Sequence, residues 1–386
     1  MPRFSWLLVS LILTAGSARG NDAKPATPDS PSRTLLAAAN EVKERALAEM
    51  IRDYQKLEAE QLPDAEKFPK QKAIYDRFQS ASIPTFDGLL GAASDHPEDP
   101  ASVEALGYVV SNGRGLGTEQ SKRALALLRR DHVRTPSITT ATRMLFLQPY
   151  QPEATALLRA VIADNPSRTE CGRACLDLAY LLHSYLAADV GRDDRAALKA
   201  EEESLYDRCV AEFADVTVGG YGTDKTVGDY AQGALIEFRQ LQVGQVAPEI
   251  IGQDVDGKPL RLSDSRGKVV VLTFSGEWCP PCRANAKFFR DLLKPQAQEA
   301  TPCVILEVNT DETRDPLRKA LGAGDITWPC WFDGGLTGPI TVAWGVRSFP
   351  TIYVLDAQGV IRAKDIRGEA TAAAVAKVLK TQTVGK

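Results

Sequence analysis

Histidine is scarce in this sequence, and none lies near the one Cys-x-x-Cys pair, Cys279 and Cys282. The three histidines, His96, His132 and His183, all lie in the first half of the chain. A zinc site built on this pair would need two further soft ligands, and Cys303 and Cys330 do not supply them at a zinc-like spacing. Covalent haem attachment requires His directly after the second cysteine, where Arg283 stands. We therefore expect no metal and no cofactor.

The sequence also lacks an excess of positive charge. Lys and Arg total 46 against 50 Asp and Glu, for a net charge of −4. This balance offers no basic field for nucleic acid or anionic lipid, so nucleic acid is excluded as a partner. With 44% hydrophobic and 25% charged residues, the composition is that of a folded globular protein. A length of 386 residues favours two or three domains.

No apolar run is as long as the roughly 18 to 20 residues of a membrane-spanning helix. The run from about Phe4 to Ala15 follows one Arg and precedes small residues, with a plausible cleavage site at Ala18-x-Gly20. This pattern predicts a secretory signal peptide over 1–20 and an extracytoplasmic protein, periplasmic or secreted. An uncleaved N-terminal anchor is the alternative. There is no cysteine near the cleavage site, so a lipoprotein anchor is not indicated.

Strand-like alternation is missing between Thr34 and about Gln240. Residues 21–33 are rich in Pro, Ser and Asp and predict a flexible linker. The apolar positions then recur three and four apart, which predicts an α-helical domain over 34–240. Turn residues interrupt it at HPEDP (96–100) and SNGRGLG (111–117).

An internal duplication lies within this helical region. The segments starting at Ala124 and Ala154 align at an offset of 30, with eight identities in 16 positions. Ser167 and Glu170 form a capping-box pattern before the next helix. The period resembles tetratricopeptide-like helical hairpins, and an irregular helical bundle remains the alternative.

The periodicity changes after about residue 241. The segment EIIGQDVDGKPLRL predicts a hairpin around Asp256-Gly257, and KVVVLTF predicts a buried parallel strand. Further strands are expected in CVILEVNT, TWPCWFD and PTIYVLDAQGVIRAKDI, the last as an antiparallel hairpin. They alternate with helices expected over 282–294, 313–321, 337–344 and 369–380. The sequence therefore predicts a second, α/β domain over 241–386.

The cysteine pair lies where a buried strand gives way to a helix expected to begin at or just after Cys279. Helix N-termini stabilise anions, which favours a thiolate at Cys279. Cys282 would lie one turn further on, more buried, as the resolving thiol. Pro280 and Pro281 remove two amide donors and stiffen the loop. A static disulfide is the structural alternative, although so short a loop gains little chain-entropy stabilisation.

Three segments together resemble a known family: WCPPCR, the preceding VGQVAPEIIGQDVDGKPLRLSDSRGK and the later SFPTIYVLDAQGVI. They resemble the extracytoplasmic thioredoxin-like proteins of the TlpA and ResA group, over about residues 243–382. The resemblance implies a thioredoxin fold and thiol-disulfide exchange, with Cys279 as nucleophile and Cys282 as resolving cysteine. It implies that Pro350 is a cis-proline facing the pair and that the Phe349 backbone binds substrate. Trp278 and Gly368 match the family's aromatic flank and a loop glycine near the site, or pack in the core.

Two positions depart from the related patterns. Thr273 stands where thioredoxins commonly carry a buried Asp, and Asn285 stands where ResA-type proteins often carry Glu. A buried carboxylate with a raised pKa is the usual proton acceptor for the resolving thiol. Glu277 and water are the substitutes that the sequence offers.

The remaining cysteines leave their pairing open. Cys171 and Cys175 share a helix face and Cys209 lies on a later helix, so either a bridge or buried thiols are possible there. Cys303 and Cys330 each open a strand and are expected mainly in the core.

The leading function is an exported thiol:disulfide oxidoreductase that acts on protein substrates with cysteines or disulfides. The resemblance implies that it reduces them with electrons from a membrane thiol carrier. A peroxiredoxin-like thiol peroxidase is one alternative, because the segment before the pair resembles peroxiredoxins as well. A helical docking scaffold with an accessory redox domain is the other.

Overall fold

The computed structural model describes residues 30–60, 62–113, 118–143, 145, 151–187, 194–218, 225–293 and 303–383. The predicted signal peptide and most of the predicted linker lie outside this part. The chain divides into two compact units, with the division between Ala231 and Gln232. None of the described helices is both long and apolar enough to cross a bilayer.

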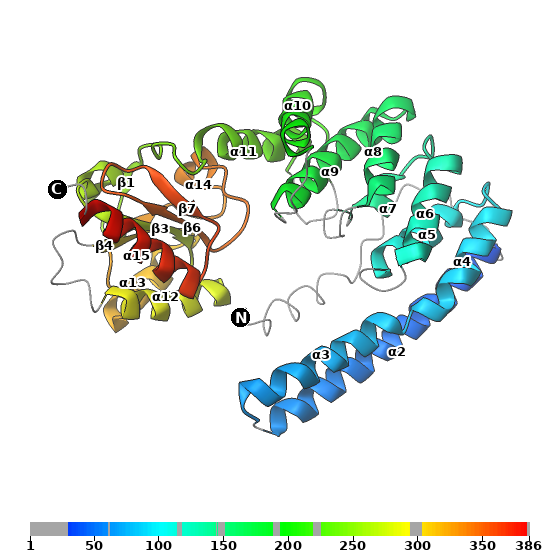
Figure 1. Cartoon of the computed structure of the whole chain (residues 1–386), viewed down its shortest axis with the longest axis horizontal. Coiled ribbons are helices and arrows are strands. Elements are labelled where there is room, and N and C mark those ends of the chain that lie inside the picture. The colour runs from blue at the N-terminus through cyan, green and yellow to red at the C-terminus, as the bar shows by residue number, and fades with distance from the viewer. Residues whose placement is uncertain are drawn as a thin grey trace. The chain divides into compact units, whose positions relative to one another are not determined.

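The first unit is built from helices (Figure 1). They are α2 (Pro31–Ala59), α3 (Asp64–Ser80), α4 (Ile83–Asp95), α5 (Ala101–Asn112), α6 (Thr118–Asp131), α7 (Thr139–Thr142), α8 (Pro152–Asp164), α9 (Arg168–Ala187) and α10 (Arg195–Phe213), followed by α11 (Val227–Gln240), within which the units divide. Many helices pack on the next one along the chain, such as α2 on α3, α8 on α9 and α9 on α10. This confirms the predicted helical region.

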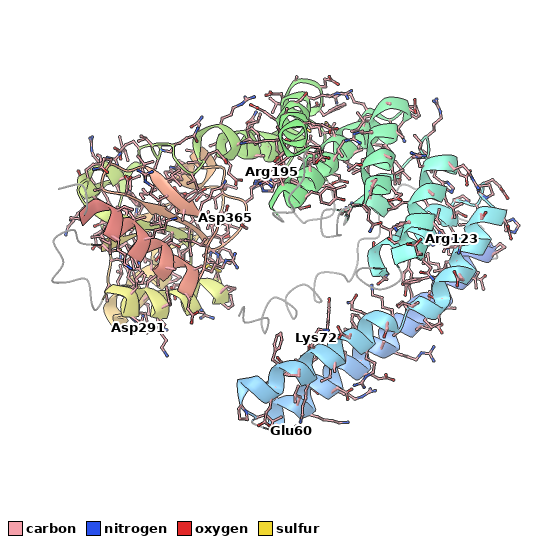
Figure 2. All side chains as sticks on the ribbon, viewed as in Figure 1. Glu60, Lys72, Arg123, Arg195, Asp291 and Asp365 are labelled. Carbon is pink, nitrogen blue, oxygen red and sulfur yellow. A yellow bond between two sulfur atoms is a disulfide. The ribbon has the colours of Figure 1, made fainter. Side chains whose placement is uncertain are left out.

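Charged side chains cover the outer surfaces of these helices. Lys72 on α3 and Arg123 on α6 are largely exposed and project into solvent (Figure 2). Apolar side chains such as Phe86, Leu106 and Leu182 are completely buried between the helices. The apolar stripes that predicted helices from the sequence are thus the faces that pack.

Helix α2 begins earlier than the sequence predicted. Pro31 occupies the first turn, and the Ser30 hydroxyl accepts a hydrogen bond from the Arg33 N–H at 3.2 Å. Proline is well tolerated at a helix start and Ser is a favoured N-cap. The segment from Pro31 to Arg33 is therefore helix, and including it in a flexible linker was wrong.

The second unit contains a five-stranded mixed sheet in the order β5-β4-β3-β6-β7. Its strands are β3 (Val269–Ser275), β4 (Cys303–Asn309), β5 (Cys330–Phe332), β6 (Thr351–Leu355) and β7 (Ile361–Lys364). Strands β3, β4 and β5 are parallel, whereas β6 pairs antiparallel with β3 and with β7. A separate hairpin joins β1 (Ile251–Gln253) to β2 (Pro259–Arg261). Both hairpins predicted from the sequence are confirmed.

Helices cover both faces of this sheet. Helices α12 (Pro280–Leu293), α13 (Arg314–Ala323) and α15 (Glu369–Thr383) pack on one face through residues such as Phe289, Leu317 and Val375 (Figure 1). The end of α11 and the short α14 (Pro339–Ala343) contribute to the other apolar cluster. Every residue of β3 is buried, as its unbroken apolar run predicted. This arrangement is the predicted thioredoxin-like fold.

Candidate active site

The site is the turn between β3 and α12. Cys279 and Cys282 form a disulfide, with their Cα atoms 5.2 Å apart. Helix α12 begins at Pro280, directly after Cys279, as the sequence predicted. Because β3 is central and completely buried, it holds the start of this turn firmly at the carboxyl edge of the sheet.

The first turn of α12 directs backbone N–H groups at Cys279. The Cys282 N–H lies 3.3 Å from the Cys279 Sγ, and the Cys279 carbonyl accepts hydrogen bonds from the Cys282 and Arg283 amides at 3.0 and 3.1 Å. Pro280 and Pro281 have no N–H, so the Cys282 amide is the first donor available to that sulfur. After reduction, the same amide and the positive end of the helix stabilise a thiolate at Cys279.

Burial does not separate the two cysteines. Each is 3% exposed, so the expectation that Cys282 is the more buried of the two was wrong. Their difference lies in their positions, since Cys279 precedes the helix and receives the amide, whereas Cys282 lies inside its first turn.

The segment after β4 holds the turn in place. Thr310 donates its N–H and its hydroxyl to the Ser275 carbonyl at 2.8 and 2.7 Å. The Asp311 carboxylate accepts the Glu277 N–H at 2.9 Å, and Thr310 Oγ1 accepts the Trp278 Nε1–H at 3.2 Å. Thr310 and Asp311 were not identified from the sequence, because only the pairing of β3 with β4 brings them to the motif.

Trp278 and Phe349 meet beside the cysteine pair. Trp278 is 49% exposed, and its ring lies edge to face with that of Phe349, the centroids 5.3 Å apart. The Phe349–Pro350 peptide bond is cis, as the resemblance implied. Phe274 pairs with Thr351 across β3 and β6, which places Pro350 at the same sheet edge as the turn.

Gly368 belongs to the loop that precedes α15. It adopts a left-handed backbone conformation, with φ of 55°. Its neighbour Arg367 donates from Nη2 to the Pro350 carbonyl at 3.3 Å. This bond connects the Gly368 loop to the cis-proline segment, and Arg367 was missed from the sequence because it lies outside the matching motifs.

A buried carboxyl group lies in β4. Glu307 is 2% exposed, and burial raises its pKa to about 7. It pairs in register with Thr273, the position where the expected carboxylate is absent. The signal in the sequence was one acidic residue inside the apolar run CVILEV. Burial also raises the pKa of Glu277, and the nearby Asp311 adds to that shift.

The other cysteines contribute no second disulfide. All are buried thiols: Cys171, Cys175, Cys209, Cys303 and Cys330. This settles the pairing that the sequence left open in favour of thiols. Within the described ranges, no group of three or more His, Cys, Asp or Glu side chains could hold a metal ion.

Comparisons with known proteins point to the same part of the chain. Residues 243–364 match the AhpC/TSA family. The chain is 29% identical over 152 residues to the thiol-disulfide oxidoreductase ResA of Bacillus thuringiensis, covering 39% of this chain and 85% of that protein. It is 31% identical over 135 residues to ResA of Geobacillus thermodenitrificans, covering 35% and 75%.

One further relative and one solved structure align with the same part of the chain. The thioredoxin-like protein YneN of Bacillus subtilis is 30% identical over 122 residues, which cover 32% of this chain and 70% of YneN. The thioredoxin domain of a thiol-disulfide oxidoreductase from Bacteroides vulgatus aligns with 36% of this chain and 99% of that domain, at 27% identity and a TM-score of 0.33. Because the match to ResA of Geobacillus thermodenitrificans has 31% identity over three quarters of that protein, the chain belongs, through its thioredoxin-like domain, to the ResA-type thiol-disulfide oxidoreductases.

Proposed function

We propose that this protein exchanges disulfides with cysteine-containing protein substrates through Cys279 and Cys282, outside the cytoplasm. The observation that carries the proposal is the cysteine pair at the start of α12, with the Cys282 amide directed at the Cys279 sulfur. The signal-peptide pattern over 1–20 supports export. The exposed Trp278 beside Phe349 supports docking of a substrate segment next to the pair.

The reaction runs through a mixed disulfide. In the reduced protein, the Cys279 thiolate attacks one sulfur of the substrate disulfide, and the other substrate sulfur leaves as a thiolate. The Cys282 thiol then loses its proton and attacks the Cys279 sulfur, which releases the second substrate thiolate. The products are a dithiol substrate and the Cys279–Cys282 disulfide, so two electrons pass from protein to substrate.

The direction in the cell follows from the family resemblance, which favours reduction of substrates. A membrane thiol carrier would then return two electrons to Cys279 and Cys282. A reductant is expected to have a potential near that of thioredoxin, about −270 mV, and far below about −120 mV, the value of strongly oxidising relatives. Equilibration with glutathione buffers measures this potential.

Trapping with Cys282→Ser tests the proposal. Without the resolving thiol, Cys279 should stay linked to substrate, so mixed disulfides accumulate and appear as bands that collapse on reduction. The reduced wild type should reduce insulin with regeneration by a dithiol, and Cys279→Ser should abolish both activities. The double variant Cys279→Ser/Cys282→Ser is the control that traps nothing.

The second candidate function is a thiol peroxidase, which the match to the AhpC/TSA family supports. A peroxide-consumption assay on the same proteins tests it. Peroxide consumption without insulin reduction or trapped protein would contradict exchange and favour the peroxidase. Exchange with no peroxide consumption is the expected result.

A further inference from the structure

Glu307 lies on β4, beside the central strand β3, and within the described ranges no Lys, Arg or His forms an ion pair with it. Its register neighbours are Thr273 on β3 and Cys330 on β5. Oε2 accepts a hydrogen bond from the Trp328 indole N–H at 3.0 Å. Within the described chain, Oε1 is buried with no hydrogen-bond partner, and the Thr273 hydroxyl is in the same condition.

Two unsatisfied polar atoms on adjacent strands are costly. A buried polar group without a hydrogen-bond partner loses its hydration on folding and gains nothing in return, which destabilises the fold. Val and Leu would fill these positions without that cost, as they do elsewhere in β3 and β4. A carboxyl group kept there against the cost of burial is typical of a functional group.

The pleat of the sheet turns Glu307 toward α12. Val271 and Ile305 lie two residues before Thr273 and Glu307, so each pair shares one face of its strand. Val271 and Ile305 pack in the same apolar cluster as Phe289, and Ala286 packs against that cluster. Thr273 and Glu307 therefore lie on the face that α12 covers.

The helix periodicity brings Cys282 to the same face. Cys282 lies one turn before Ala286, and residues four apart share a helix side. Cys282 is buried, at the end of α12 nearest the carboxyl edge of β3 and β4. Thr273 and Glu307 are each two residues closer to that edge than Val271 and Ile305 are.

We propose that Glu307 is the proton acceptor for the Cys282 thiol in the resolving step, in place of the carboxylates missing at Thr273 and Asn285. The inference rests on the proposed exchange function. The Cys282 proton moves to the Glu307 carboxylate, the Cys282 thiolate forms the bond to the Cys279 sulfur, and the substrate thiolate leaves. Glu307 then releases the proton to solvent, which restores its carboxylate, and the substrate thiolate that has left takes up a proton from solvent.

The electrostatic surroundings suit this task. Burial, aided by the negative charges of Glu277 and Asp311, raises the pKa of Glu307 to about 7, whereas polar contacts with Trp328 and Asn309 act to lower it. A base with its pKa near the working pH is the most effective. Cys330 on β5 is a further titratable neighbour, and Glu307 helps to raise its pKa.

The test follows single turnovers of the full chain with a disulfide peptide, quenched in acid at different pH values. Wild type should resolve its mixed disulfide with a rate that rises through an inflection near pH 7. Glu307→Gln, which keeps an acceptor for Trp328, should slow resolution on the order of 10²-fold and lose the inflection. The first step, the attack by Cys279, should keep its rate.

Two further variants make the test specific. Thr273→Asp, which places a carboxyl on the neighbouring strand of the same face, should restore part of the rate to Glu307→Gln. Trp328→Phe removes a hydrogen bond that favours the ionised carboxylate, so the inflection should move to higher pH. This second readout does not require Glu307→Gln to fold.

The outcomes separate this inference from the proposed function. A wild-type resolving rate and pH profile in Glu307→Gln, or an unmoved inflection in Trp328→Phe, would overturn the assignment of Glu307 alone. A wild type that forms no mixed disulfide at all would overturn both the exchange function and this assignment.

Discussion

Trp278 owes its position to the absence of a side chain at Gly276. A Cβ atom built on Gly276 would lie 2.4 Å from the Trp278 Nε1 and 3.1 Å from the Thr310 Oγ1. The indole fills that space, donates to Thr310 and packs against Phe349. One glycine thus determines how the exposed tryptophan is presented beside the cysteine pair.

Gly276→Ala should displace Trp278 and slow disulfide exchange. The indole is at the surface and can swing away, so the cost is the lost Thr310 hydrogen bond and Phe349 contact, together about 1 to 3 kcal/mol. Thermal unfolding and insulin reduction measure the two effects. Gly322→Ala in α13 is the matched control, since its Cβ meets nothing within 4 Å. A Gly276→Ala protein that equals the control would contradict this account.

Some residues of the site can be located from local sequence motifs, and others only from the pairing of strands. Cys279, Cys282 and the cis Pro350 could be located from the sequence, because each lies in a short local motif. Thr310 and Glu307 could not, because only the β3–β4 register brings them next to the motif and to Thr273. Sequence spacing describes neighbours along the chain, whereas these contacts join strands whose pairing forms on folding.

Helix α9 illustrates the same limit for a capping motif. The Ser167 hydroxyl accepts the Glu170 N–H at 3.3 Å, as a capping box requires. The Glu170 carboxylate does not return to the Ser167 amide, which bonds to Asn165 instead. It accepts the N–H and the hydroxyl of Thr139 at 2.9 and 2.7 Å, and so fastens α7 to α9. The Ser167 half of the predicted capping box is therefore confirmed, whereas the Glu170 carboxylate binds Thr139 instead of the Ser167 amide.

Glu170→Ala should therefore destabilise the helical unit through α7. The change leaves the buried Thr139 amide and hydroxyl without their charged acceptor, at a cost of about 1 to 3 kcal/mol. Urea unfolding followed by circular dichroism measures the loss. Glu119→Ala, in the first turn of α6, is the matched control: its carboxylate is exposed and pairs only with Lys122 among the contacts described, so a change below about 0.5 kcal/mol is expected. Equal effects of the two variants would show that the Thr139 contacts contribute nothing.

The division of the whole chain depends on α11. The sequence placed the boundary after Gln240, where the helical pattern ends, and we propose that the sheet domain needs the second half of α11 as well. Glu237 pairs with Arg347 and with Lys364, whose Nζ lies 2.9 Å from the Glu237 carboxylate. Leu241 is buried in one apolar cluster of this unit, and Ile236 packs against it. A periodic pattern locates a helix, but it does not tell which unit each of its turns stabilises.

Two fragments distinguish these boundaries. A fragment of residues 227–386 should fold and exchange disulfides like the full chain, because it keeps Ile236 and Glu237. A fragment of residues 241–386 leaves Arg347 and Lys364 without their partly buried partner, and should be less stable by about 2 kcal/mol or more. Urea unfolding and insulin reduction compare them, with Glu237→Ala in the longer fragment as the control for the ion pairs.

Equal stability of the two fragments would show that the sheet domain begins after Gln240.

The same proteins test the role of the helical unit, which we propose selects protein partners. The Cys282→Ser form of the longer fragment should trap small disulfide peptides as the full chain does, since Cys279 and the turn around it are intact. Its set of trapped proteins should differ from that of full-length Cys282→Ser, because the surfaces of α2 to α10 are gone. An unchanged set would mean that Trp278, Phe349 and their surroundings alone choose the substrate.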